Sequence, residues 1–313
     1  MTDVARAQLG PGSHARIVGS VRAEEPPDEP DTATGFTYAL LHTWQGIAGL
    51  ALAGVVLAVV LFGPMLAPWS PTEPNVGPTL ATASWHHPLG TDTLGRDIFS
   101  RFLSGGRTVI LVPLVAVTLA FVIGGALGIY AAYVEGWRDA VITRTFDFLA
   151  ALPPLLLVLL LVAGLGTSDL VVTATVAIVF LPRIGRLVRG TAQAVTKNDY
   201  VKAAEARGER TVTILWRELA PNIAGPAIAD FSLRLTYGVM FVASLNFLGL
   251  GVQPPSPNWG VMINEYRTFL SYNPLATIVP AVGIVFLSVA FNLLADALTR
   301  RYQPGLTRWT IPL

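Results

Sequence analysis

The sequence predicts an all-α, polytopic membrane protein with six transmembrane helices, and three observations support this prediction. First, hydrophobic residues make up 52% of the 313 residues and charged residues only 13%, whereas soluble domains carry about 25% charged residues. The mean hydropathy of the chain is +0.56. Second, the apolar residues gather in runs close to the roughly 20 residues that a helix needs to cross a bilayer. Third, the basic residues between those runs favour one side.

The two ends of the chain are expected to lie outside the membrane. Residues 1–40 are rich in Pro, Glu, Asp, Gly, Thr and Ala and show no apolar periodicity, so they predict a disordered tail. The first apolar run begins only near Gly46, too late for a cleavable signal peptide, and is therefore expected to stay as a first span. Residues 303–313 are expected to form a short C-terminal tail.

Residues 41–302 are predicted to form one transmembrane domain. The run that ends at Pro182 is short. It becomes a span if the helix continues past Arg183, Arg186 and Arg189, whose long side chains can reach the membrane interface. A tight outer turn at 166–169 would separate this helix from the one before it. The six predicted spans are about 46–67, 109–133, 147–166, 170–190, 223–250 and 274–298.

The distribution of Lys and Arg predicts the orientation. With the N-terminus inside, sixteen of the 21 Lys and Arg residues fall in cytoplasmic segments and four in outer segments, while Arg234 lies within the fifth span. Cytoplasmic segments of membrane proteins carry such an excess. Both ends are therefore expected to be cytoplasmic, which requires an even number of spans. The polar segment between spans four and five, residues 196–221, then also faces the cytoplasm.

This polar segment is predicted to contain two short helices. Asp199 is expected to cap a helix that begins at Tyr200, and Gly208 suits the left-handed turn that ends a helix. A second helical stretch over 211–219 is expected to stop before Pro221. The segment would be either a docking surface for a protein in the cytoplasm or an ordinary amphipathic surface loop.

The same segment carries a recognisable pattern. Ala203-Ala204, three residues, Gly208, and Pro221 thirteen positions later resemble the EAA loop of bacterial ABC importer permeases. The two alanines would let the backbone of a partner approach closely. The chain departs from the family pattern at three positions, with Lys202 in place of Glu, Glu218 in place of Ile and Ala220 in place of Leu.

Three further blocks are similar to the same family and follow in the family's order. The resemblance covers about residues 40–300, and within the family it is to the C-type membrane subunit of the dipeptide/oligopeptide/nickel branch. The blocks are His87 to Arg101; Gly136-Trp137-Arg138-Asp139 with Arg144 and Asp147 before Pro153-Pro154; and Asn246 to Pro255 with Asn258-Trp259-Gly260.

The resemblance implies a function and a set of partners. The fold would be the type I importer permease architecture in a bacterial inner membrane. The partners would be a homologous second permease, two cytosolic ATPases that hold ATP and Mg²⁺, and an extracytoplasmic solute-binding protein that delivers peptide. Nickel, glutathione or a glycoside are alternative solutes. The residues implied in coupling to an ATPase are Tyr200, Lys202, Ala203, Ala204, Gly208, Arg217 and Pro221.

The block before the second span is interpreted as a structural anchor, with substrate contact as the weaker alternative. Its glycines and aspartates suit turns and helix caps, and its arginines can pair with nearby carboxylates. The neighbouring His86-His87 pair does not predict a metal site, because no Cys or Glu lies at ligand spacing. The residues of this block are Gly90, Asp92, Gly95, Arg96, Asp97 and Arg101.

The chain is not expected to be an enzyme. Residues 103–107 resemble the signature sequence of ATPases, but a phosphate-binding loop needs a Lys after a Gly. The two lysines, Lys197 and Lys202, follow Thr196 and Val201 instead, so ATP hydrolysis is assigned to another polypeptide. No Ser/His/Asp constellation is evident, and the chain has no cysteine. No cofactor, metal or nucleic-acid partner is expected.

Two features within the spans leave alternatives open. Asp230 and Arg234 lie four residues apart in the fifth span, which suits either a functional intramembrane pair or a structural i,i+4 pair. The glycines Gly124, Gly125, Gly128 and Gly164 would allow close helix approach, or would simply face lipid.

A secondary transporter that works alone is the rival function from another class. Such transporters use membrane-embedded carboxylates or interrupted helices in an internal repeat. Beyond Asp230 the predicted spans contain almost no carboxylates, so this alternative is less favoured. A membrane scaffold is a third alternative.

Overall fold

A computed structural model describes the backbone of residues 41–302 and the side chains of residues 41–298. The two expected tails, 1–40 and 303–313, lie outside the described residues. Within the described part, the regular elements are helices, and the only β-type contact is an isolated bridge between Thr91 and Asp97. The all-α prediction is confirmed.

Five helical runs are long and apolar enough to cross a membrane, and a bent pair of helices makes a sixth if it is counted as one span. Side-chain oxygens cap the first turns of α2, α3, α6 and α10. The elements are α2 Trp44–Leu66, α3 Ile98–Val134, α4 Gly136–Ala151, α5 Pro154–Leu165, α6 Asp169–Val195, α7 Asp199–Ala206, α8 Thr211–Ile214, the π-helical turn η1 Leu215–Leu219, α9 Ala220–Phe247, α10 Trp259–Tyr266, the 3-10 turn η2 Arg267–Phe269 and α11 Leu275–Tyr302.

The predicted third span, 147–166, is not one straight helix. It is divided between α4 and α5, which meet at an angle of 88°. The break lies at Pro153-Pro154, where Leu152 and Pro153 both have ψ values in the extended range. The reason is steric, because a proline disfavours helical geometry in the residue before it and offers no backbone N–H. Two successive prolines therefore end α4 and start α5 in a new direction.

The helix after the polar segment does not stop before Pro221 as expected. Instead α8, η1 and α9 form one helical run over Thr211–Phe247. The π-helical turn lies immediately before the proline. A π turn widens the helix by one residue and so changes which backbone groups pair, which accommodates a residue without an N–H. The polar segment is consequently continuous with a membrane helix.

The most extensive helix packing joins α3 to α6. A Cβ atom on Gly124 would lie 2.7 Å from the Leu181 carbonyl oxygen, and one on Gly128 would lie 2.5 Å from the Gly185 carbonyl oxygen. The two helix backbones thus approach as closely as glycine permits, which confirms close approach at these two positions. Gly164 has no neighbour within 4 Å of its ideal Cβ position, which fits the alternative that it makes no close helix contact within this chain.

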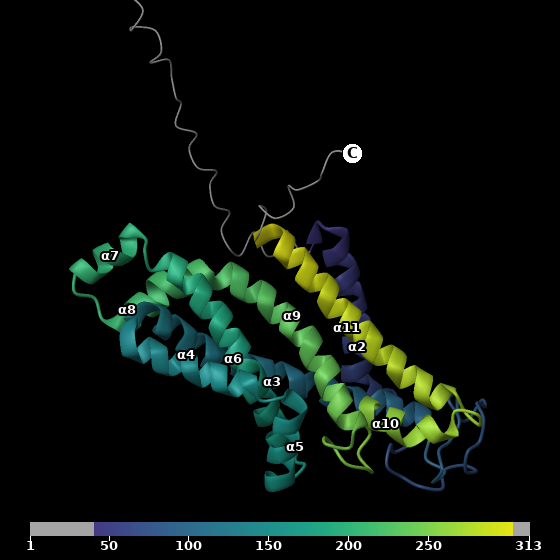
Figure 1. Cartoon of the computed structure of the whole chain (residues 1–313). Helices are drawn as coiled ribbons and strands as arrows, with labels where there is room; N and C mark the ends of the chain where they lie inside the picture. The colour runs from purple at the N-terminus through teal and green to yellow at the C-terminus, as the bar shows by residue number, and fades with distance from the viewer. Residues whose placement is uncertain (1–40, 303–313) are drawn as a thin grey trace, which may run out of the picture.

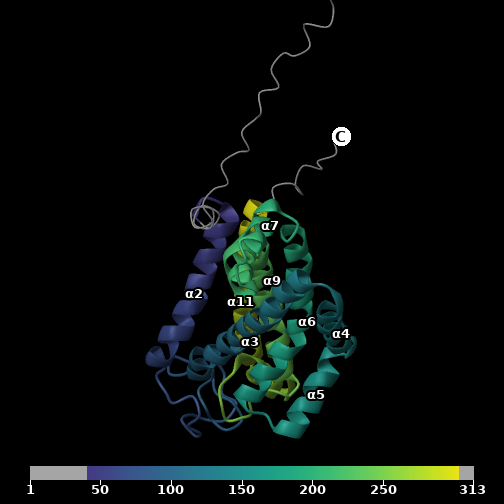
Figure 2. The same ribbon diagram turned by 90° about the vertical axis from the view of Figure 1, so that its left-hand side faces the viewer.

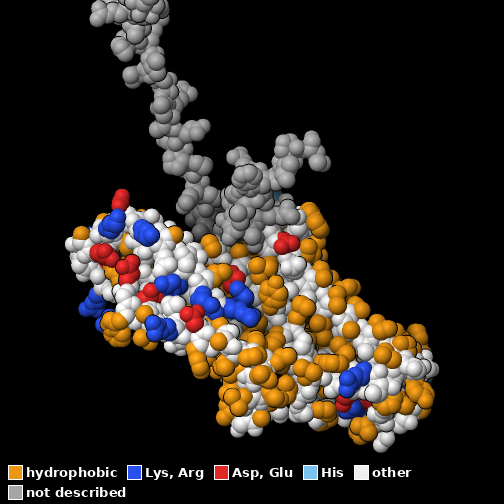
Figure 3. All heavy atoms as spheres, viewed as in Figure 1, with side chains coloured by type: hydrophobic (Ala, Val, Ile, Leu, Met, Phe, Trp, Pro, Cys, Tyr) orange, Lys and Arg blue, Asp and Glu red, His pale blue; other side chains and the backbone are white. Residues whose placement is uncertain are grey.

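The helices place the polar segments at two opposite ends of the molecule. The start of α2, the end of α11 and the short helix α7 share one end (Figures 1 and 2). The segment before α3 and the helix α10 lie at the other end (Figure 1). In the space-filling view, charged side chains gather over the end that carries α7 and α8, and hydrophobic side chains cover the middle (Figure 3). This pattern is that of a protein embedded in a bilayer by its middle.

We expect Gly128→Ala to destabilise the protein. The added methyl group would meet the backbone of α6 at 2.5 Å, and overpacking of this kind costs about 1–3 kcal/mol. Thermal unfolding of the purified protein in detergent measures the change.

Gly125→Ala is the matched control, because its nearest neighbour would be 4.0 Å away. Alanine favours a helix interior over glycine, so this variant should be unchanged or slightly more stable. Equal melting temperatures for the two variants would contradict the proposed role of the α3–α6 contact.

Candidate functional site

The segment expected to couple to an ATPase, residues 196–221, is called the coupling segment below, and it begins with a helix whose cap differs from the expected one. Asn198 occupies the cap position, and Asp199 is the first helical residue. Neither side chain caps the backbone N–H groups of α7 within the described contacts. The Asp199 carboxylate is fully exposed and lies 3.4 Å from the Lys202 ammonium. The N-cap prediction for Asp199 is therefore wrong by one residue.

Helix α7 has one buried and one exposed face. Val201 and Ala204 point into the protein and join the core that also contains residues of α3 and α6. Tyr200, Lys202 and Ala203 are exposed. The expectation that both alanines receive a partner is therefore wrong for Ala204, whose exposed fraction is 0%. Of the two paired alanines, Ala203 is the one that offers a small side chain to another molecule.

The bend after α7 has the predicted left-handed geometry. Gly208 has a φ of +73°, and its N–H donates to the Glu205 carbonyl at 2.9 Å. The N–H of Glu209 donates to the Ala204 carbonyl at 3.2 Å. These two bonds close the C-terminal end of α7 in the manner of a glycine cap. Glycine is required here by backbone conformation, since no neighbouring atom lies within 4 Å of its ideal Cβ position.

The second half of the coupling segment presents apolar side chains outward. Val212 and Trp216 are 66% and 74% exposed, whereas Ile214 and Leu219 are buried in the core. Arg217 and Pro221 are exposed at the same end of the molecule. Val212 and Trp216 were not predicted from the sequence to be part of this exposed surface. Their i,i+4 spacing on a helical segment was the signal that could have found them.

Two contacts hold the coupling segment and its surroundings to the membrane helices. The hydroxyl of Tyr133, at the end of α3, interacts with the carboxylate of Glu205 on α7. Nearby, both oxygens of Asp139 on α4 accept hydrogen bonds of 2.6 Å from Arg189 on α6. A bidentate pair of this kind fixes orientation as well as distance. The first contact joins α7 to α3, and the second fixes α4 against α6, next to the core that contains Val201 and Ala204.

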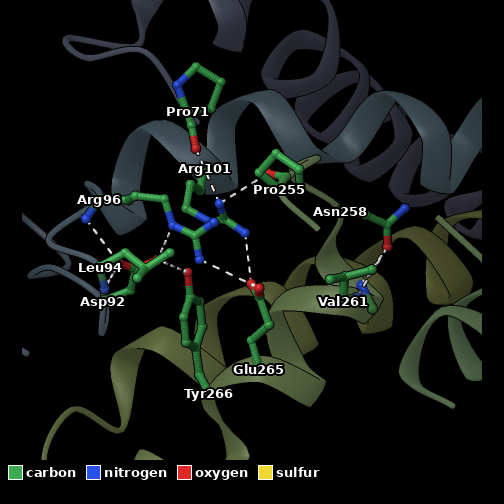
Figure 4. A network of polar contacts seen from close by, with 11 residues as sticks. Pro71, Asp92, Leu94, Arg96, Arg101, Pro255, Asn258, Val261, Glu265 and Tyr266 are labelled. Atoms are coloured by element: carbon green, nitrogen blue, oxygen red, sulfur yellow. Dashed lines mark hydrogen bonds and ion pairs between the residues drawn. The ribbon is translucent and has the colours of Figure 1, made fainter. Parts of the chain in front are cut away.

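The opposite end of the molecule contains a buried ionic cluster (Figure 4). The Arg101 side chain is fully buried, and one of its terminal nitrogens lies 2.7 Å from Oε2 of Glu265. Its other terminal nitrogen donates to the carbonyl oxygens of Pro71 and Pro255. The cluster therefore ties the start of α3 to α10 and to the loops beside both helices.

A second half of the cluster centres on Asp92. Its carboxylate accepts from the backbone of Leu94 and Arg96, from the Arg96 Nε at 2.5 Å and from the Tyr266 hydroxyl at 3.1 Å. Burial raises the pKa of Tyr266 well above its usual range, because the charged phenolate would lose its hydration. The phenol thus remains a hydrogen-bond donor to Asp92.

The remaining residues of the predicted outer block shape the turn before α3. Asp97 accepts from the Ser100 backbone N–H at 2.8 Å and lies 2.9 Å from His87 Nδ1. Gly90 and Gly95 both have positive φ values. No group of three or more His, Asp or Glu side chains suited to a metal ion is present within residues 41–298. The geometry supports the anchoring interpretation, which stays a prediction.

The two residues of α10 that take part in this cluster were not predicted from the sequence. Glu265 and Tyr266 lie more than 160 residues from the arginines and aspartate that they contact. The quoted block Asn258-Trp259-Gly260 starts the same helix. Asn258 caps it and donates to Thr108 at 2.7 Å, and the Trp259 indole donates to the Phe102 carbonyl at 2.8 Å. Gly105 and Gly106, in the segment that resembles an ATPase signature, provide room for the Trp259 ring.

A cavity of about 560 Å³ lies among α5, α6 and α9. Arg183 and Phe180 of α6 line one wall, and Arg234 and Tyr237 of α9 line another. The predicted pair of Asp230 and Arg234 is present, with 3.1 Å between Oδ2 and Nε. The pair therefore has a structural contact, and its arginine also borders the cavity.

Comparison with known proteins identifies relatives along most of the chain. Residues 124–308 match the family described as "Binding-protein-dependent transport system inner membrane component". A glutathione transport system permease protein, GsiD, from Pectobacterium atrosepticum is 40% identical over 74% of this chain and 75% of its own length. A dipeptide transport system permease protein, DppC, from Alkalihalophilus pseudofirmus is 32% identical over 94% of this chain and 98% of its own length.

A solved structure shares the fold. It is an inward-facing conformation of the MetNI methionine ABC transporter, with a TM-score of 0.50 and 16% sequence identity. The likeness covers 63% of this chain and 94% of the matched chain. At this identity the similarity concerns the fold alone.

We expect Glu265→Gln to destabilise the protein strongly. The substitution removes the carboxylate that faces two buried arginines, and breaking a buried ion pair costs about 3–5 kcal/mol. Thermal unfolding in detergent measures the loss.

Asp199→Asn is the matched control, because it removes the carboxylate of a fully exposed pair with Lys202. Exposed pairs contribute about 0–1 kcal/mol. A melting temperature of Glu265→Gln as high as that of the control would show that the ionic cluster of Arg101 and Glu265 does not stabilise the fold.

Proposed function

The chain belongs to the family of binding-protein-dependent transport system inner membrane components, and from this premise we propose that it imports peptides as one of two permeases driven by separate ATPases. It is a multi-pass membrane permease of the ABC importer class. Its partners are a homologous second permease, two cytosolic ATPases and an extracytoplasmic solute-binding protein. ATP and Mg²⁺ bind to the ATPases.

The coupling segment is the observation that carries this proposal. It combines an exposed face at Tyr200, Lys202 and Ala203 with a buried face in the core of the membrane helices. A surface of this kind can receive a protein from water and pass a displacement inward. The exposed Val212 and Trp216 extend the surface with apolar area, as protein interfaces require at their centres.

The continuous run from α8 to α9 gives the displacement a path. A displacement of α7 is transmitted to the helical run of α8, η1 and α9, which continues without a break to Phe247. The α9 helix lines the cavity through Arg234 and Tyr237. Closure of the ATPases would thus change access to the cavity, and hydrolysis would reset it. The two access states form an equilibrium that contacts with the ATPases bias.

The relatives support a peptide as the solute. One similar permease is named for dipeptides and another for glutathione, which is itself a tripeptide. Both solutes carry free carboxylates. Nickel or a glycoside are the alternative solutes, and the solute-binding protein would select among them.

The proposed orientation places the coupling segment in the cytoplasm. The excess of Lys and Arg supports this side. The start of α2 and the end of α11 lie at the same end of the molecule as α7 (Figure 2). Both ends of the described chain would therefore face the cytoplasm across a bacterial inner membrane.

Reconstitution separates this function from that of a secondary transporter. Proteoliposomes containing both permeases, both ATPases and the binding protein should take up radiolabelled dialanine or glutathione only when ATP is enclosed. Uptake by this chain alone, driven by an ion gradient, would overturn the proposal.

We expect Gly208→Val to uncouple ATP hydrolysis from uptake while the protein still inserts in the membrane. A β-branched residue at a φ of +73° is strained by roughly 1–2 kcal/mol, which would reshape the bend after α7. ATPase activity and uptake are measured in the same proteoliposomes.

Gly208→Asn is the control, because asparagine tolerates left-handed geometry and the surrounding space is open. It should keep most of the coupling. Normal uptake by Gly208→Val at normal expression would count against the assignment of this bend.

We expect Ala203→Leu and Ala204→Leu to fail in different ways. Ala203 is exposed, so the larger side chain should leave the melting temperature unchanged and weaken ATPase co-purification. Ala204 is fully buried, so the same change should lower the melting temperature through overpacking by about 1–3 kcal/mol. Full co-purification of the ATPases with stable Ala203→Leu would remove α7 from the interface.

A further inference from the structure

Three arginines follow one another at intervals of three residues on α6, and the structure separates them. Arg189 forms the bidentate pair with Asp139, and Arg186 lies 3.4 Å from Asp147. Among the described side chains, Arg183 has neither an ion-pair nor a hydrogen-bond partner. The sequence alone gives no reason to distinguish the three arginines. In the structure, only Arg186 and Arg189 pair with carboxylates of α4.

The unpaired arginine lies near the middle of a long helix, and its side chain is exposed to the space that it lines. Arg183 is near the middle of α6, about 20 Å from its first residue at 1.5 Å per residue. It lines both the 560 Å³ cavity and the small hollow at the bend between α4 and α5. The C-terminal end of α4, at Leu149 and Leu152, borders that hollow. The partial negative charge of a helix C-terminus stabilises a cation, so Arg183 is held without being neutralised.

The rest of the cavity is suited to a small polar solute with apolar parts. Arg234 lies on the facing helix, and its Nε is paired with the carboxylate of Asp230. Tyr237 and Ser244 add hydroxyl groups to the lining, and Phe241 stacks edge-to-face on Phe180 with ring centroids 6.2 Å apart. A volume of about 560 Å³ lies within the range of ligand cavities, roughly 300–1,000 Å³.

From these observations we propose that the cavity among α5, α6 and α9 is a transient binding site for the solute, in which Arg183 binds its free carboxylate. This inference rests on the proposed function and names the chemical group that the permease itself recognises. The attraction between a guanidinium and an anion is stronger inside a membrane protein than in bulk water. A guanidinium also matches both oxygens of a carboxylate.

The pairing of charges explains why Arg183 and not a neighbour takes this role. Arg186 and Arg189 already have carboxylates, and Arg234 has Asp230 on its own helix. A carboxylate that enters the cavity therefore finds one uncompensated cation. Binding must also be weak enough for release, and a single charged contact in an open chamber meets that requirement.

The test compares a dipeptide with its amide on the assembled importer. Nanodiscs that contain both permeases and both ATPases, without the solute-binding protein, are titrated with dialanine and with dialanine amide. We expect wild type to bind dialanine at least about tenfold more tightly than the amide, equivalent to about 1.4 kcal/mol. Arg183→Gln should bind both probes equally, with the affinity of the amide.

Two further variants control for charge and for position. Arg183→Lys should retain part of the discrimination, because lysine keeps the charge but lacks the planar fork. Arg186→Gln should retain all of it, because Arg186 is paired with Asp147 and does not line the cavity. Discrimination that persists in Arg183→Gln, or that is absent from wild type, overturns the proposal.

The experiment also distinguishes two other outcomes. One is that Arg183 binds a lipid phosphate, and the other is that the proposed function itself is wrong. If Arg183→Gln changes thermal stability in phosphatidylglycerol nanodiscs but leaves peptide discrimination intact, Arg183 binds a lipid phosphate and the proposal is overturned. Wild-type proteoliposomes with the binding protein that take up neither dialanine nor glutathione contradict the proposed function itself. Normal uptake together with unaltered discrimination in Arg183→Gln contradicts only the cavity site.

Discussion

The close contact between α3 and α6 is the constraint on which the rest of the structure depends. Gly124 and Gly128 bring the two backbones together, and the core that forms around this contact extends to Val201 and Ala204 of α7. The same helix α6 provides the arginine that faces the cavity. Helix α7, the cavity wall and the membrane helices therefore belong to one packed body, so a displacement of one part is transmitted to the others.

Polar interactions at the two ends have different designs. At the end that carries α10, Arg101 and Asp92 are buried and Glu265 is half-buried, and Arg101 Nε is the one buried side-chain atom of this cluster without a partner among the described residues, which suits a fixed anchor. At the other end, the pairs of Lys202 and Arg207 are largely exposed and contribute little to stability. Such residues are free to exchange their partners for those of another protein.

Much of this arrangement could be predicted from the sequence, because apolar run length and turn chemistry are local properties. The all-α membrane fold and the left-handed bend at Gly208 followed from them. The missed features depend on contacts between distant segments. One such feature is the bend between α4 and α5 at Pro153-Pro154. Helix α4 supplies carboxylates to Arg186 and Arg189 but none to Arg183, and no local pattern predicts this difference. Ala203 and Ala204 likewise differ only in which side of α7 meets the core.

The buried arginine of the ionic cluster has a consequence for how the protein is made. Arg101 and its partner Glu265 are separated by 164 positions, so the arginine is synthesised long before its carboxylate exists. Until α10 arrives, a cation that the finished protein shields completely is left to water and lipid headgroups. This end of the molecule is therefore completed only after α10 has been synthesised, and a chain truncated before α10 would leave the charge of Arg101 without its carboxylate partner.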